Sequence, residues 1–129
     1  MAAVAARLLL GLPLIVFGLN GFLNFIPPPP EPLAEGATAF AKALLDTGYM
    51  MPLIGGTQLL VGVLLVVNRF VPLALVLFTP FIVNAVAFHL ALEPTGLVPA
   101  LVFLGLHLGL AWCHRAAYAP LLRASFSAD

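Results

Sequence analysis

The sequence predicts an all-α membrane protein, an antiparallel bundle of four transmembrane helices with a short amphipathic helix in its first, outer loop. Two observations predict this fold. Hydrophobic residues make up 63% of the chain and charged residues 8%, whereas soluble domains have roughly 45–50% and about 25%. Four long apolar stretches are separated by three short breaks that hold nearly every charged residue. A crossing needs about 20 apolar residues, so four crossings use most of a single domain, residues 1–129.

The apolar stretches give the bounds of the expected crossings. They are Ala5–Ile26, Met50–Val67, Phe70–Leu92 and Gly96–Cys113. We expect the first crossing to be retained, because it is longer than the core of a signal peptide and precedes no small-residue cleavage pattern. Only Asn68 and Arg69 turn the chain between the second and third crossings, and such tight breaks make sequential helices antiparallel neighbours. The stretches lack the alternation of barrel strands, which argues against β crossings.

The first loop has a predicted order of its own. Pro27 to Pro30 favour extended polyproline backbone, and Pro32 suits a helix start. An amphipathic helix is then expected over residues 33–46, with Gly48 as its stop signal. Its apolar face comprises Leu33, Ala37, Phe40, Ala41, Leu44 and Leu45, and its polar face Glu35, Thr38, Lys42 and Asp46. Such a helix either anchors in the outer interface or folds over the bundle as a cap.

The distribution of charge predicts the orientation. The basic residues on one side are Arg7, Arg69, Arg115 and Arg123, whereas the other side holds Lys42 with Glu31, Glu35, Asp46 and Glu93. Because cytoplasmic loops retain Lys and Arg, we expect both termini in the cytoplasm.

Composition also excludes several classes of function. The net charge is zero and there is no basic run, so nucleic acid is not an expected partner. A single cysteine, Cys113, excludes an internal disulfide and any Cys-x-x-Cys motif, and we expect it to be a buried thiol. The chain offers no nucleophile, metal cluster or dinucleotide motif, so we do not expect an enzyme that works alone.

Four polar residues, one in each crossing, are the candidate binding residues: Asn20, Gln58, Asn84 and His107. Counted from the outer end of each crossing, they fall in one shallow layer. Gly55 and Gly62 share a helical face with Gln58, and Gly105 and Gly109 bracket His107, which favours inward orientation. The four either hydrogen-bond one another between helices or line a polar pocket for the head group of a quinone or lipid. Asn, Gln and neutral His all supply the donors that quinone carbonyls need.

His89 and Glu93 stand one turn apart near the outer end of the third crossing. Their spacing allows an ion pair or a shared metal, but two ligands are too few for a zinc site, and no metal is expected. We expect His89 to contact terminal carbonyls and Glu93 to end the helix before Pro94 and meet Lys42. A haem held by a single histidine stays open as an alternative.

Three segments carry a resemblance to a known family. They are Phe17-Gly-Leu-Asn-Gly-Phe-Leu-Asn-Phe-Ile-Pro27, Asn68-Arg-Phe-Val-Pro-Leu-Ala-Leu75 and Pro80-Phe-Ile-Val-Asn-Ala-Val-Ala-Phe-His-Leu-Ala-Leu-Glu-Pro94. Together they resemble the DoxX family of small four-helix membrane proteins of bacteria, which implies an inner-membrane location and an association with quinone-linked oxidoreductases. Gln58 and His107 stand where that resemblance leads us to expect glutamates, which puts in doubt a function that needs a carboxylate there.

The expected function is therefore that of a membrane accessory subunit in a quinone-linked oxidoreductase system, with quinone as its one candidate cofactor. Membrane lipids and other membrane-protein subunits are the expected partners. The alternative is a purely structural subunit that packs against a larger respiratory or photosynthetic complex. A transporter or channel is disfavoured, because the chain lacks an inverted repeat and a charged pathway.

Overall fold

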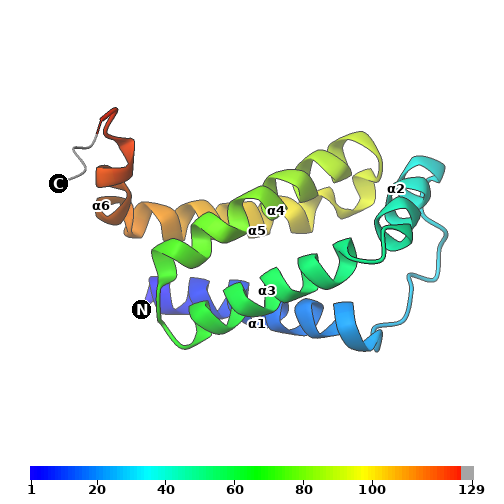
Figure 1. The fold of residues 1–129 in the computed structure, drawn as a ribbon, viewed down its shortest axis with the longest axis horizontal. Coiled ribbons are helices and arrows are strands. Elements are labelled where there is room, and N and C mark those ends of the chain that lie inside the picture. The colour runs from blue at the N-terminus through cyan, green and yellow to red at the C-terminus, as the bar shows by residue number, and fades with distance from the viewer. Residues whose placement is uncertain (126–129) are drawn as a thin grey trace.

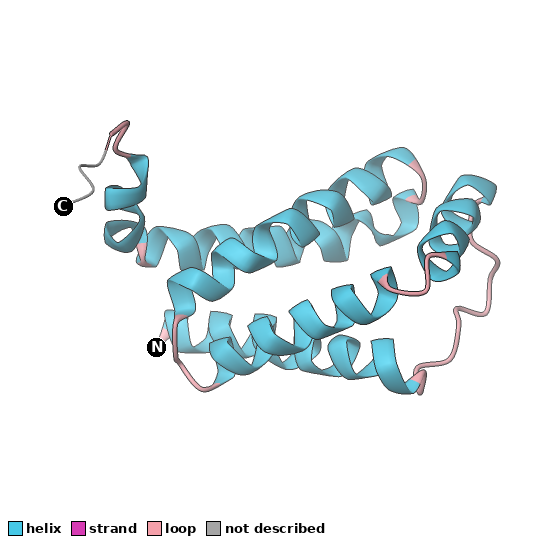
Figure 2. Cartoon of the chain, in the orientation of Figure 1, coloured by secondary structure: helices cyan, strands magenta, loops and turns pink. Residues whose placement is uncertain are grey.

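The computed structural model describes residues 1–125, and within them the chain is helical without any strand (Figures 1 and 2). This confirms the predicted all-helical class. The elements are α1 (Ala2–Leu23), α2 (Glu35–Asp46), α3 (Met50–Val66), α4 (Val71–Ala91), the 3-10 turn η1 (Pro94–Gly96), α5 (Leu97–Cys113), α6 (Arg115–Tyr118) and the 3-10 turn η2 (Ala119–Leu122).

Three segments are long and apolar enough to cross a membrane: α1, α4, and η1 together with α5. The helix α3 becomes a fourth only when joined to α2, from which it is bent by 91°. It has 17 residues, a length of about 25 Å, which lies at the lower limit for a crossing. Length and composition thus support a membrane protein with three or four crossings.

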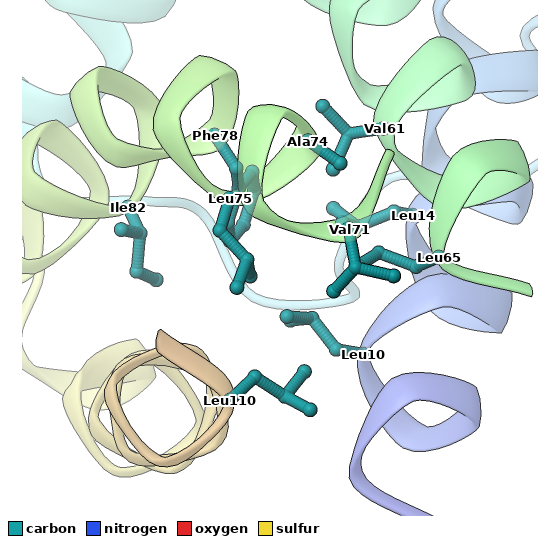
Figure 3. Close-up of a cluster of buried hydrophobic side chains, with 10 residues drawn as sticks. All are labelled: Leu10, Leu14, Val61, Leu65, Val71, Ala74, Leu75, Phe78, Ile82 and Leu110. Carbon is teal, nitrogen blue, oxygen red and sulfur yellow. The ribbon is translucent and has the colours of Figure 1, made fainter. Parts of the chain in front are cut away.

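The long helices lie alongside one another, with α2 at one end and α6 at the other (Figure 1). A core of buried side chains joins them: Leu10, Leu14, Val61, Leu65, Val71, Ala74, Leu75, Phe78, Ile82 and Leu110 (Figure 3). These residues come mainly from the end of the bundle where α3 turns into α4. The opposite end, beside α2, is packed less completely and contains the cavity described below.

Glycines allow α1 and α3 to pack backbone against backbone. A Cβ built on Gly18 would lie 2.6 Å from the backbone nitrogen of Leu59, and one on Gly62 would lie 2.8 Å from the carbonyl oxygen of Gly11. Small residues at such contacts let membrane helices approach closely. The predicted inward face of Gly55, Gln58 and Gly62 is confirmed, since all three are buried.

The helix ends differ from the predicted bounds by up to three residues. Helix α1 stops at Leu23 instead of Ile26, because Asn24 adopts a left-handed conformation with φ 49°. Helix α3 ends in a pair of backbone hydrogen bonds, from Arg69 N–H to the Leu64 oxygen and from Asn68 N–H to the Leu65 oxygen. This arrangement is the Schellman motif, which satisfies the terminal carbonyls.

A buried arginine reinforces the same helix end. Arg7 of α1 is only 9% exposed, and its guanidinium donates to the carbonyl oxygen of Leu65 at 3.1 Å. A cation at a helix C-terminus is favourable, because the free carbonyls there carry partial negative charge. Arg7 therefore ties α1 to the end of α3.

Helix α2 begins at Glu35 and covers one end of the bundle, so the structure favours the cap over the free interfacial anchor. Its Ala37 is fully buried, and the ring of Phe40 lies 5.4 Å from that of Phe88 in α4. The predicted stop is confirmed, since Gly48 has φ +73° just after the helix. The predicted apolar face is wrong at Leu45, which is 60% exposed, and at Leu33, which is exposed and precedes the helix.

A single carboxylate holds the start of α2 against the turn after α4. Glu93 is 8% exposed; its Oε2 accepts from the backbone N–H of Ala34 at 2.8 Å, and its Oε1 accepts from the Thr95 hydroxyl at 2.7 Å. The expected contact between Glu93 and Lys42 is wrong. Lys42 instead pairs with Asp46 one turn along α2, at an exposed position where such a pair contributes little.

Because the Glu93 carboxylate accepts these hydrogen bonds, we predict that the packing of α2 against the turn after α4 depends on pH. The Ala34 N–H, followed by the Thr95 hydroxyl, holds the pKa of Glu93 below its ordinary value of 4.5. Since the folded pKa is lowered, this stabilisation is complete above pH 4.5 and is lost as the pH falls through the lowered pKa.

Hydrogen exchange of the Ala34 amide, followed by NMR as a function of pH, measures this effect. Its protection factor, which compares its exchange rate with that in the unfolded chain, should therefore fall at acidic pH. Glu93→Ala should remove the protection at every pH. Glu31→Ala, at an exposed position in the loop that contains Ala34, is the control and should leave the protection unchanged. Protection of Ala34 that survives Glu93→Ala would contradict the assignment.

Candidate functional site

A largely apolar cavity of about 310 Å³ lies toward the α2 end of the helices. Four helices and the turn η1 contribute to its wall: Leu14, Phe17, Gln58, Phe81, Ile82, Ala85, His89, Gly96, Pro99, Ala100 and Phe103. The space is more open than enclosed, and its volume is at the lower end of ligand sites, which have about 300–1,000 Å³. The cavity can therefore hold one ring with substituents.

Gln58 is the buried polar side chain of this wall. It is 8% exposed, and within residues 1–125 its amide makes no hydrogen bond. Helix α3 fixes it there, because the close contacts of Gly55 and Gly62 with α1 turn this face inward. Among residues 1–125, the fully buried polar side-chain atom without a partner is His107 Nδ1, so the amide of Gln58 keeps accessible surface that a ligand oxygen can reach.

His89 is the second polar group of the cavity wall. Its Nδ1 lies 2.8 Å from the carbonyl oxygen of Glu93, which confirms the predicted contact with terminal carbonyls. Its ring makes a T-shaped contact with that of Phe88, with centroids 5.1 Å apart. Its ring also lies so close to Gly96 that a side chain at that position would overlap with it. These three contacts hold the imidazole in one orientation.

His107 is buried but is not among the residues that line the cavity. Its Nε2 lies 3.2 Å from the Thr79 hydroxyl, which in turn donates to the carbonyl oxygen of Leu75 at 2.8 Å. Its ring packs against Phe78, and its Nδ1 is buried without a hydrogen-bond partner in the described part of the chain. Thr79 therefore links α4 to α5, a role the sequence analysis missed.

Neither asparagine joins the predicted polar layer. Asn20 is half-buried, and its Oδ1 accepts the backbone N–H of Ile26 at 2.7 Å, so it stabilises the end of its own helix. Asn84 is exposed on α4. It lies two residues beyond the buried Ile82, a rotation of about 200° around the helix, so the predicted inward orientation is wrong.

The four predicted residues thus do not form one cluster. Among residues 1–125 no hydrogen bond joins any two of Asn20, Gln58, Asn84 and His107. The support expected from Gly105 and Gly109 is also missing, because both face open space. Of the predicted set, only Gln58 lines the cavity.

The other end of the molecule carries the remaining reactive side chains. Cys113 is exposed, so the expected buried thiol is wrong. His114 ends α5, with its Nδ1 2.8 Å from the Leu110 oxygen, and the guanidinium of Arg115 lies 5.1 Å from the ring centre of Trp112. In the described residues no group of three or more His, Cys, Asp or Glu side chains could hold a metal ion.

Comparison of the chain with protein-family models, with curated proteins and with solved structures finds no match. The fold and the cavity are therefore the basis for a functional proposal, and the resemblance to the DoxX family stays a prediction.

Proposed function

We propose that this chain is a multi-pass protein of a bacterial inner membrane, related to the DoxX family, with α1, α3, α4 and α5 as its four crossings. The apolar character of the three long segments supports this, as does the close packing of the shorter α3 against α1. A helix of 17 residues reaches across a bilayer when its ends are extended by interfacial residues.

The proposed orientation has both termini in the cytoplasm. Arg7 contacts the end of α3, next to the turn that contains Arg69. The Tyr118 hydroxyl donates to the Pro72 oxygen at 3.1 Å, which brings α6 and its Arg115 to the same end. Three arginines are therefore gathered at the end opposite α2, in agreement with the preference of basic residues for the cytoplasmic side.

The cavity is proposed to bind the ring head group of a lipid-soluble quinone. One observation carries the proposal: an apolar space of about 310 Å³ is lined by Gln58, whose amide makes no hydrogen bond within residues 1–125. Apolar walls suit the ring, and the NH₂ of Gln58 can donate to a ring oxygen. A ligand confined to the bilayer would reach this site from the lipid.

Binding without chemistry is the proposed role, in an accessory subunit of a quinone-linked membrane oxidoreductase. The two polar groups of the cavity wall, Gln58 and His89, offer hydrogen bonds but no redox centre. The alternative, a purely structural subunit of a larger complex, requires that the buried polar groups satisfy one another. The free amide of Gln58 argues against that alternative.

Gln58→Leu tests the proposal. In nanodiscs, this variant should bind a short-tailed benzoquinone at least about tenfold more weakly than the original protein, because the amide hydrogen bond is lost. Asn84→Leu is the matched control: it removes an amide of α4 that is exposed and does not line the cavity, so binding should be unchanged.

Calorimetric titration gives both affinities. If Gln58→Leu binds as tightly as the original protein, or if the original protein binds neither the oxidised nor the reduced form of the quinone, the binding role is refuted. Purification of a larger assembly without quinone on this chain would then favour the structural subunit.

A further inference from the structure

The hydrogen bond of His89 fixes the position of its proton. A carbonyl oxygen only accepts, so the Nδ1 that lies 2.8 Å from the Glu93 oxygen must carry the hydrogen. In the neutral imidazole the other nitrogen, Nε2, is then an acceptor with a free lone pair. Within residues 1–125 no donor reaches this Nε2, whereas the ring itself lines the cavity.

The orientation of this acceptor is built into the fold. The ring packs against Gly96, which also lines the cavity, and makes a T-shaped contact with Phe88. The bond to Glu93 ties it to the turn whose carboxylate holds the start of α2. A rotated ring would lose the Glu93 bond, so the imidazole keeps its acceptor nitrogen free for a ligand.

The two polar side chains of the cavity wall therefore differ in the hydrogen-bonding group that they can pair with on a ligand. The amide of Gln58 both donates and accepts, so it suits a carbonyl or a hydroxyl oxygen. In the neutral imidazole, Nε2 of His89 only accepts, so it suits a hydroxyl and opposes a carbonyl, whose lone pairs would face its own. A ring with a hydroxyl group satisfies both, whereas a quinone leaves His89 unsatisfied.

We propose that the cavity selects the reduced, hydroxyl-bearing hydroquinone over the quinone, with the ring hydroxyl donating to His89 Nε2 and Gln58 bonded to a ring oxygen. This inference rests on the proposed function and concerns the form of the ligand that binds, without any transfer of electrons at the site.

The test compares a short-tailed hydroquinone with its own quinone, titrated under anaerobic conditions into the protein in nanodiscs. The protein should bind the hydroquinone about tenfold more tightly, the effect of one buried hydrogen bond. His89→Phe keeps a ring but removes the acceptor, and it should bind both forms about equally. His89→Gln supplies an acceptor oxygen and should restore part of the preference.

His114→Phe is the matched control, because His114 makes the same type of bond to a carbonyl at the far end of α5, away from the cavity. It should keep the full preference. Equal affinity for the two forms in the original protein, or a preference that survives His89→Phe, would overturn the selection while leaving ring binding intact. Failure of both forms to bind would instead refute the proposed function, and this inference with it.

Discussion

Gly18→Ala should lower the free energy of unfolding by about 2 kcal/mol. The added Cβ would lie 2.6 Å from the backbone nitrogen of Leu59 and 2.8 Å from the carbonyl oxygen of Gly55. Backbone atoms of a helix cannot rotate away as a side chain can, so α1 and α3 must separate. Overpacking of this kind costs about 3 kcal/mol, and the better helix propensity of alanine returns about 1 kcal/mol.

Gly109→Ala is the control for this prediction, since a Cβ there meets nothing within 4 Å. The same substitution should then stabilise the protein by up to about 1 kcal/mol, through propensity alone. Equilibrium unfolding in mixed micelles followed by circular dichroism measures both changes. Equal effects of the two variants would mean that the contact between α1 and α3 does not limit stability.

The sequence was sufficient to predict the four long helices, because a long apolar run between polar breaks has few alternatives, but it did not indicate the short α6. It placed their ends less accurately, because the ends depend on local backbone geometry. Helix α1 ends before its predicted bound because Asn24 adopts a left-handed conformation and the side chain of Asn20 accepts the N–H of Ile26. Likewise α5 begins at Leu97, one residue after the predicted start, because Gly96 belongs to a 3-10 turn.

Glycines indicated the inner face correctly on α3 but not on α5, where His107 is buried although Gly105 and Gly109 face open space. Gln58 shares its face with Gly55 and Gly62, and that face is buried. Asn84 lies in a helix that is apolar all round, so its sequence carries no period from which an inner face could be inferred. Asn84 was assigned to the predicted polar layer from its depth in the membrane alone, and depth does not determine which way a side chain points around its helix.

Contacts between distant segments escaped the sequence analysis for a different reason. Glu93 bonds to Ala34, 59 positions away, through a backbone N–H that every residue except proline possesses. Charge alone pointed to Lys42 instead. Phe17 and Phe103 are likewise indistinguishable in the sequence from other apolar residues of their helices. They line one cavity because α1 and α5 pack together.

Thr79→Val should lower the free energy of unfolding by about 2 kcal/mol. The Thr79 hydroxyl donates its hydrogen to the Leu75 oxygen, so toward His107 it is the acceptor, and Nε2 of that imidazole carries the proton. His107 already has one buried nitrogen without a partner. Valine would leave both nitrogens unpaired, and an unsatisfied buried donor costs about 1–3 kcal/mol.

His107→Phe separates this explanation from a simple packing defect. It removes both nitrogens and keeps a ring against Phe78, and the Thr79 hydroxyl retains its bond to Leu75. The single variant should therefore change stability little, and Thr79→Val should cost almost nothing in its presence. The double-mutant cycle, measured by unfolding in mixed micelles, should give a coupling of about 2 kcal/mol. Additive effects of the two substitutions would show that Thr79 stabilises α4 independently of His107.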